Sequence, residues 1–255
     1  MIDPPLLQRT EDGVRVLTFN RPTRRNALDA SGWTALAEAL DAALDDRTVR
    51  AVVLTGAGEV AFCAGQDLSE MTALPQPDTP HPFGRCMDAL CRFDKVLIAA
   101  VNGVAVGGGL TILLHCDFVF VADNAKMRAP FVQLGVIPEA ASSYLLPLIC
   151  GHRGAAEVLY GADWISAERA VALNIATKLT TQAAVVGDAV AQGRRVARHA
   201  PEALRHTKRL VLATRAEQVA AARAREDAGF AERIGSAENR EAIAAFFERR
   251  PPRFD

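Results

Sequence analysis

Short apolar runs recur along the first half of the chain. VRVLTF, at residues 14–19, has the pattern of a β-strand. Three further runs are almost continuously apolar and rich in β-branched residues, which is typical of strands buried on both faces of a sheet. They are AVVLT at 51–55, VLIAAV at 96–101 and FVFVA at 118–122.

Segments with apolar residues at helical spacing lie between these runs. The stretch SGWTALAEALDAAL, at residues 31–44, places four large apolar residues on one helical face, namely Trp33, Leu36, Leu40 and Leu44. The alternation of strands and helices continues to about residue 180. It predicts an α/β fold in which helices cover mainly parallel strands.

The last part of the chain has a different pattern. From residue 185 to 249 it is rich in Ala, Arg and Glu at helical spacing, with Pro201 placed to begin one helix and Ser236 to cap another. We therefore divide the chain into a core, residues 1–195, and a helical C-terminal region, residues 196–255. The last helix has an apolar stripe formed by Ile243, Phe246 and Phe247. We expect this region to dock on other subunits of a homo-oligomer, the alternative being that it folds back on its own core.

Composition narrows the class of protein. The chain has 255 residues, half of them hydrophobic, with 29 Lys and Arg against 30 Asp and Glu, so no overall field attracts nucleic acid or an anionic membrane. The segment MIDPPLLQRTEDG lacks the features of a secretion signal. The five cysteines contain no CxxC pair, and we expect reduced thiols with no metal site. These features predict a cytoplasmic enzyme or binding protein that contacts neither nucleic acid nor membrane.

One segment is dominated by proline. TALPQPDTPHPF, at residues 72–83, contains four prolines and cannot form regular structure. We expect a loop that acts as a lid. We expect Met71 and Phe83, at its two ends, to pack in the core, the alternative being that they line the acyl pocket.

A dinucleotide site is one candidate function. AVVLTGAGEVA places G-x-G-x-x-A directly after a predicted strand. In a dinucleotide fold these glycines open a helix, whereas here VAFCAGQDL follows with another glycine and no helical period. We therefore do not expect the protein to bind NAD.

Two other glycine sites suggest acyl chemistry. In AFCAGQDL (61–68) Gly65 follows a strand-like segment and frees the amide of Gln66, and in VAVGGGL the amide of Gly108 lies where a helix begins. Two converging amides form an oxyanion hole, which stabilises negative charge on a carbonyl oxygen, and a helix dipole would reinforce the second donor. The alternative is that these glycines only form tight turns.

These motifs also carry a resemblance. RPTRRNAL, GAGEVAFCAGQDL, VNGVAVGGGLTILLHCDFVFVADNAK, LGVIPEAASSYLLP and PEALRHTKRL follow one another along nearly the whole chain. In this order they resemble the crotonase, or enoyl-CoA hydratase/isomerase, superfamily. The resemblance implies a spiral of ββα units with two roughly perpendicular sheets, a helical C-terminal region that forms trimers or hexamers, and an acyl-CoA ligand.

The same resemblance implies the contacts of the ligand. The thioester oxygen would lie at the amides of Gln66 and Gly108, and coenzyme A would be part of the substrate, with no other cofactor. We expect Asp67 to brace its own turn as well, and the two adjacent arginines have a solvated surface pair as their alternative role. The implied substrate contacts are Arg24, Arg25, Ala27, Ala64, Gln66, Asp67, Leu68, Gly107, Gly108 and Phe131.

The position of carboxylates decides which reaction is expected. Hydratases of the superfamily usually have two glutamates, at the positions that Thr111 and Phe131 occupy here. Glu139, in VIPEAASSY, is instead similar to the glutamate of peroxisomal-type Δ3,Δ2-enoyl-CoA isomerases. We therefore expect Glu139 to be the base of an isomerase. Three alternatives stay open: that it caps the following helix, that the protein is a hydratase, or that it binds CoA without catalysis.

Overall fold

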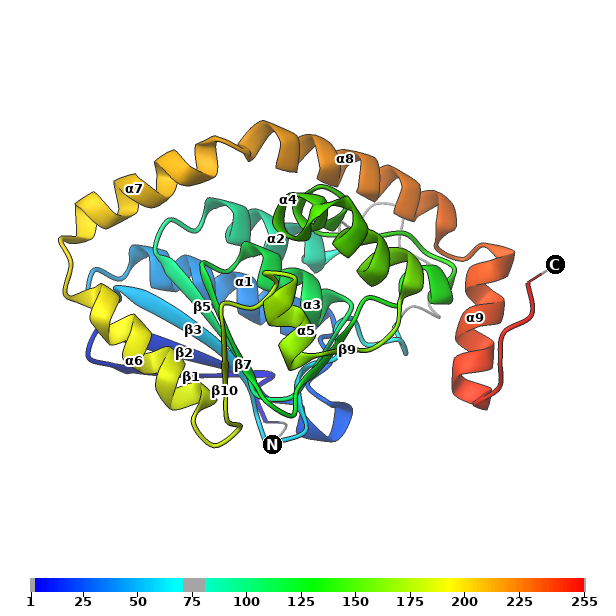
Figure 1. Cartoon of the computed structure of the whole chain (residues 1–255), viewed down its shortest axis with the longest axis horizontal. Helices are drawn as coiled ribbons and strands as arrows, with labels where there is room; N and C mark the ends of the chain where they lie inside the picture. The colour runs from blue at the N-terminus through cyan, green and yellow to red at the C-terminus, as the bar shows by residue number, and fades with distance from the viewer. Residues whose placement is uncertain (1–2, 71–80, 255) are drawn as a thin grey trace.

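The computed structural model describes residues 3–70 and 81–254 (Figure 1). Met71 and most of the proline-rich segment at 72–83, including the expected lid, therefore lie outside the described residues. Within the part that is described, His81 caps helix α2 (Pro82–Arg92) by accepting a hydrogen bond from the amide of Phe83.

A six-stranded sheet forms one layer of the core. Its strand order is β1-β2-β3-β5-β7-β10, and only the β1–β2 pair is antiparallel. The four runs predicted as strands are β2, β3, β5 and β7, so this part of the sequence analysis is confirmed. The strands are β1 (Leu6–Glu11), β2 (Val14–Phe19), β3 (Ala51–Gly56), β5 (Val96–Val101), β7 (Phe118–Ala122) and β10 (Lys178–Thr180).

A second, smaller sheet has the order β4-β6-β8-β9. Its strands are β4 (Ala61–Cys63), β6 (Val104–Val106), β8 (Lys126–Arg128) and β9 (Ile165–Ser166). The chain places β3 in the first sheet and β4 in the second before a helix, and it repeats this with β5 and β6 and again with β7 and β8. This repetition is the expected spiral of ββα units.

Helices cover both sheets. α6 (Val185–Ala197) packs on β2, β3, β5 and β7, and α1 (Ala30–Asp45) packs against α2 and the β1–β2 hairpin. Trp33, Leu36 and Leu40 are fully buried on α1, as predicted, whereas Leu44 is only half-buried. The remaining helical segments of the core are η1 (Pro22–Arg24), α3 (Gly108–Thr111), η2 (Ile112–His115), η3 (Val132–Leu134), α4 (Ser142–Ala156), η4 (Glu157–Gly161) and α5 (Ala167–Ala172).

The C-terminal region is helical, as predicted. α7 (Pro201–Ala213) and α8 (Ala216–Arg233) arch over α2 and α4, and α9 (Ala237–Glu248) lies at the far end of the molecule (Figure 1). Pro201 begins α7, and the Ser236 hydroxyl caps α9 by accepting from the amide of Asn239. The apolar stripe of α9 is divided, because Ile243 is buried while Phe246 and Phe247 are 57% and 54% exposed. The boundary at residue 195 and the oligomer stay predictions.

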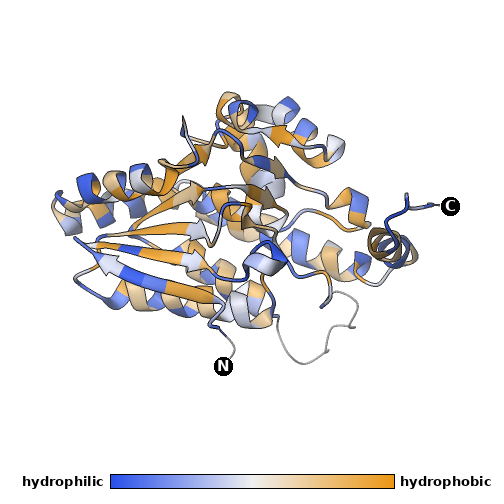
Figure 2. Ribbon diagram, turned by 90° about the horizontal axis from the view of Figure 1, so that it is seen from below, coloured by the Kyte–Doolittle hydropathy of each residue, from blue (hydrophilic) through white to orange (hydrophobic). Residues whose placement is uncertain are grey.

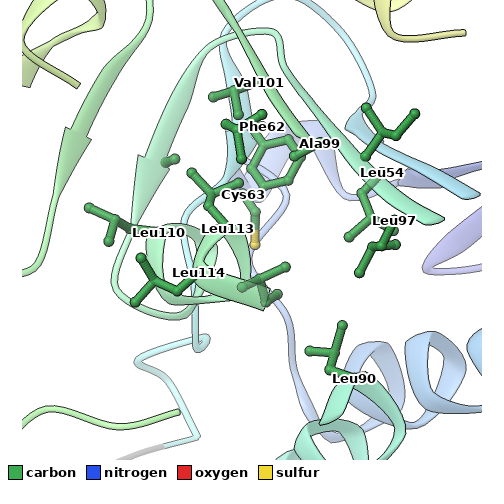
Figure 3. Close-up of a cluster of buried hydrophobic side chains, with 14 of the residues drawn as sticks. Leu54, Phe62, Cys63, Leu90, Leu97, Ala99, Val101, Leu110, Leu113 and Leu114 are labelled. Atoms are coloured by element: carbon green, nitrogen blue, oxygen red, sulfur yellow. The ribbon is translucent and has the colours of Figure 1, made fainter. Parts of the chain in front are cut away.

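Hydrophobic residues concentrate in the strands of the larger sheet, whereas the edge strand β1 is mostly hydrophilic (Figure 2). The core continues beneath the second sheet. Figure 3 shows Phe62 and Cys63 of β4 meeting Leu110 of α3 and Leu113 of η2.

Candidate active site

Two glycine turns lie against each other where β4 and β6 end. Gly65 has a φ of +79° and Gly107 a φ of +52°, values that residues with a Cβ rarely adopt. A Cβ at Gly65 would lie 2.6 Å from the carbonyl oxygen of Val106 and 2.8 Å from the amide nitrogen of Gly108. Because nothing larger than hydrogen fits there, the two turns can approach closely only with glycine at position 65.

The backbone donors in these turns divide into paired and unpaired groups. The amide of Gly107 donates to the carbonyl of Arg128 (2.9 Å), and the amide of Asp67 donates to that of Leu28 (2.9 Å). Within residues 3–70 and 81–254, the amides of Gln66 and Gly108 have no hydrogen-bond acceptor. Two unpaired N–H groups in adjoining turns are therefore available to one anionic oxygen.

The helix after the glycines is shorter than the sequence suggested. α3 is a single turn of four residues that continues as the 3-10 helix η2. A macrodipole needs a run of aligned peptide units, so the expected reinforcement of the Gly108 donor by a helix dipole is small. The helix does begin at Gly108, as expected, and the contribution of its dipole stays a prediction.

Trp33 connects the two turns. Its indole nitrogen donates to Oε1 of Gln66 (2.7 Å), and the Gln66 side-chain nitrogen donates to the carboxylate of Glu70 (3.0 Å). The other end of the indole ring lies against Gly108, where a Cβ would be 3.0 Å from the ring. The Trp33 ring also packs edge to face against Phe83, with ring centroids 5.0 Å apart. The fully buried Trp33 therefore braces both residues that carry an unpaired amide.

The side chain of Glu139 lies beside Gly108. Its Oε1 would be 3.3 Å from a Cβ at Gly108. Part of the residue surface is exposed, but burial of the carboxyl group, with the negative charges of Glu226 and Asp227, raises the pKa of Glu139 to about 8. A carboxyl with such a pKa exchanges protons readily near neutral pH.

The two usual hydratase positions hold no carboxylate. Thr111 is fully buried, with its hydroxyl oriented to the carbonyl of Gly108 (3.4 Å), and Phe131 is 5% exposed. Neither side chain ionises in the range where enzymes work. Glu139 therefore supplies the acid group next to Gly108.

The structure does not give Glu139 a helix-capping role. Its side chain accepts no hydrogen bond from α4, and only its carbonyl oxygen does, from the amide and hydroxyl of Ser142 (3.0 and 2.6 Å). The carboxylate that caps α4 belongs to Glu226 of α8, which accepts from the amides of Ala141 (2.6 Å) and Ser143 (2.8 Å). The side chain of Glu139 is thus available for another role.

The two segments expected to hold coenzyme A lie together. The amide of Ala64 donates to the carbonyl of Arg25 (3.1 Å), and the amide of Leu28 donates to that of Gly65 (2.8 Å). Both Arg24 and Arg25 are exposed, and they form no ion pair within the described residues. Of the other predicted contacts in these segments, Ala27 is buried, whereas Ala64 and Leu68 are half-buried.

Asp67 braces its own turn, as expected. Its carboxylate accepts from the amide (3.1 Å) and hydroxyl (2.7 Å) of Ser69 and pairs with Arg21 (3.0 Å). Arg21 also pairs with Asp29 (3.2 Å) and donates to the carbonyl of Ala27 (2.8 Å). Arg21 therefore has a structural role in the RPTRRNAL motif, whereas Arg24 and Arg25 are available to a ligand.

The other candidate chemistries find little support in the structure. Gly56 ends β3 and the chain passes into β4, so the G-x-G-x-x-A segment opens no helix. Within residues 3–70 and 81–254, no group of three His, Cys, Asp or Glu side chains is placed to hold a metal ion, and no helix is long and apolar enough to cross a membrane. A cavity of about 760 Å³ lies beside Arg50 and Lys95, at the start of β3 and β5, and borders none of the site residues.

Comparison with known proteins agrees with this geometry. The sequence profile of the enoyl-CoA hydratase/isomerase family matches residues 9–255. The chain is 30% identical over 244 residues to the short-chain-enoyl-CoA hydratase of Clostridium acetobutylicum, covering 94% of this chain and 93% of that protein. It is 31% identical over 254 residues to the peroxisomal enoyl-CoA delta isomerase 3 of Mus musculus, covering 96% and 78% of the two chains.

A solved structure extends the comparison to the fold. The enoyl-CoA hydratase/isomerase from Pseudoalteromonas atlantica T6c superimposes with a TM-score of 0.94 and 37% identity, covering 98% of this chain and 100% of that one. The chain belongs to the enoyl-CoA hydratase/isomerase family. It has the crotonase fold and is an acyl-CoA enzyme of that superfamily.

Sequence reasoning missed two residues of this site. Trp33 was expected only to pack in the core from the apolar face of its helix. Glu226 was not singled out. An indole N–H is nearly always paired when buried, so a tryptophan on an apolar face could have been expected to seek a polar partner. Nothing local identifies Glu226, since its partners are 83 and 85 residues away in the chain.

Proposed function

We propose that the protein is a Δ3,Δ2-enoyl-CoA isomerase in which Glu139 is the only proton carrier. The observation that supports this most directly is the placement of the Glu139 carboxyl beside Gly108, while Thr111 and Phe131 occupy the usual hydratase positions. Relatives carry both hydratase and isomerase names. The proposal therefore depends on the side chains of this chain.

In the proposed reaction the thioester oxygen of a 3-enoyl-CoA accepts hydrogen bonds from the amides of Gln66 and Gly108. Glu139 removes a proton from C2, and the electron pair of the C2–H bond enters a dienolate whose charge lies on that oxygen. The same proton then returns to C4, and the double bond moves from C3–C4 to C2–C3. One base and an oxyanion hole are sufficient, as in ketosteroid isomerase, which pairs an Asp base with an oxyanion hole.

The ligand and the assembly belong to the same proposal. The exposed guanidinium groups of Arg24 and Arg25 suit the phosphates of coenzyme A, which enters as part of the substrate. The reaction needs no metal, nicotinamide or flavin. The exposed Phe246 and Phe247 suit a contact between subunits, and the family resemblance implies that the oligomer is a homotrimer or a hexamer of two trimers.

The test compares Glu139→Gln with wild type in the conversion of 3-enoyl-CoA to 2-enoyl-CoA. Glutamine keeps the size of the side chain and removes the base, so turnover should fall by about 10²- to 10⁴-fold. Binding of acetoacetyl-CoA, measured by calorimetry, should change little. Asp227→Asn is the control, because it removes a nearby charge without removing the proposed base.

Three results would contradict the proposal in different ways. Wild-type turnover in Glu139→Gln would leave Glu139 without a catalytic role. Rapid hydration of 2-enoyl-CoA by an enzyme that never isomerises would favour a hydratase. Binding of 3-enoyl and 2-enoyl thioesters with no conversion of either would favour a CoA-binding protein without catalysis.

A further inference from the structure

The backbone directly after Glu139 is strained. Ala140 and Ala141 both have left-handed conformations, with φ of 61° and 59°. This region is unfavourable for residues with a Cβ, and two such residues in succession persist only where their surroundings hold them. Both alanines are buried, and α4 begins at the next residue. The strain is therefore located between the proposed base and the helix that follows it.

Glu226 is one of the groups that hold this backbone. It is 4% exposed, and its two carboxylate oxygens accept separately from the amides of Ala141 (2.6 Å) and Ser143 (2.8 Å). Burial raises the pKa of Glu226, and interactions with Ser143 and Ala141 partly offset this. The carboxylate reaches the loop because α8 packs along α4, as Figure 1 shows.

His115 holds the same segment from another element. Its Nε2 lies 2.9 Å from the carbonyl oxygen of Ala140. Burial lowers the pKa of His115 to about 4, so the ring is neutral near pH 7 and the tautomer protonated at Nε2 donates to this carbonyl. One carbonyl and two amides of the strained turn are thus fixed by side chains from η2 and α8.

We propose that Glu226 is a positioning residue, whose hydrogen bonds to Ala141 and Ser143 keep the strained turn in the conformation that places the Glu139 carboxyl beside Gly108. This inference rests on the proposed function, since it assigns a role in catalysis through Glu139. Glu226 itself need not touch the substrate. Loss of its two hydrogen bonds would allow the alanines to leave the left-handed region and carry Glu139 away from the site.

The experiment measures kcat, KM and thermal stability for two variants of Glu226 in the full chain. Glu226→Gln offers an N–H where an acceptor is needed, and Glu226→Asp keeps the negative charge but is too short to reach both amides. For both variants we expect kcat per acetoacetyl-CoA binding site to fall by about ten- to a hundredfold, as for a catalytic group displaced by about 1 Å. KM and the affinity for acetoacetyl-CoA should change little.

Asp227→Asn is the matched control. Asp227 is the exposed neighbour of Glu226 on α8 and also raises the pKa of Glu139, but it makes no hydrogen bond to the turn. The charges that raise the pKa of Glu139 are these two carboxylates, whereas the neutral His115 contacts the carbonyl of Ala140. Removing the charge of Asp227 should therefore shift the acidic limb of the pH profile to lower pH and leave the maximal kcat unchanged.

The outcomes separate this inference from the proposed function. If Glu139→Gln is inactive while both Glu226 variants are less stable but keep the wild-type kcat, Glu226 only stabilises the fold and the inference is overturned. An equal loss of kcat in Asp227→Asn would also overturn it, because charge rather than geometry would then be responsible. If Glu139→Gln turns over like wild type, the proposed function itself fails. Should Glu226→Gln not fold, Glu226→Asp and its control decide the question in the same way.

Discussion

The two sides of the candidate site are built in different ways. On one side, Gly65 and Gly107 provide the positive φ angles and the close approach that two backbone donors need. On the other side, Ala140 and Ala141 also have positive φ angles although neither is glycine, and they are held by His115 and by Glu226, about 85 residues further along the chain. The donors depend on what the local backbone can adopt, whereas the proposed base depends on a contact between distant elements.

The glycine side should be the less tolerant of the two. In Gly65→Ala the new methyl group would meet the carbonyl of Val106 and the amide of Gly108 at less than 3 Å, on a backbone with φ of +79°. The turns must separate, so we expect kcat to fall by about 10²- to 10³-fold, the usual cost of losing one oxyanion donor. Turnover and acetoacetyl-CoA binding measured together would show whether the loss concerns the reaction.

Gly84→Ala is a control for this substitution. Gly84 lies in α2, and among residues 3–70 and 81–254 no atom would lie within 4 Å of a Cβ there. Alanine in a helix is favoured over glycine by roughly 0.5–1 kcal/mol, so this variant should be slightly more stable and fully active. Wild-type turnover in Gly65→Ala would contradict the assignment of the turn to an oxyanion hole.

This difference also explains what could be predicted from the sequence. The glycine turns, the strands β2, β3, β5 and β7 and the cap at Ser236 follow from local patterns, and Glu139 was found through a resemblance. The bracing by Glu226 could not be predicted, because nothing near Ala140 or Ala141 in the sequence marks a left-handed turn. A left-handed turn of two alanines is imposed by tertiary contacts, so it can be recognised only in the folded structure.

Trp33 allows a finer test of the donor side, since it contacts both turns. Trp33→Phe keeps an aromatic ring in the core but leaves Oε1 of Gln66 without its donor. We expect a loss of about 1–3 kcal/mol in the free energy of unfolding. Turnover should fall by about tenfold, less than for a displacement of about 1 Å. Urea unfolding and steady-state kinetics would measure the two effects.

Trp164→Phe is the corresponding control. Trp164 is 48% exposed, and its ring lies under the guanidinium of Arg128, 5.5 Å from Cζ to the ring centroid. Its replacement should change the free energy of unfolding by no more than about 0.5 kcal/mol and leave turnover unchanged. Equal kinetic effects of the two substitutions would show that Trp33 has no special connection to the site.

The smallest expected effect concerns Glu139 and the pH dependence of activity and stability that its ionisation causes. Glu139 must be ionised to accept a proton, so kcat/KM should rise with pH and level off above about 8, where its raised pKa lies. The stability of the fold should change in the opposite direction, falling as pH rises. Between the ordinary pKa of 4.5 and about 8 the folded protein holds a proton on Glu139 that the unfolded chain has lost, and this contribution to stability declines as pH rises.

Glu139→Gln should remove this part of the pH dependence. Unfolding by urea at about pH 5 and about pH 8 should therefore differ less in the variant than in wild type. Asp227→Asn should keep the dependence and move it to lower pH, because it removes a negative charge that favours the protonated form. A kcat/KM profile that levels off near pH 5 would mean that Glu139 has an ordinary pKa. Burial of the carboxyl group would then have no effect on the protonation of the proposed base.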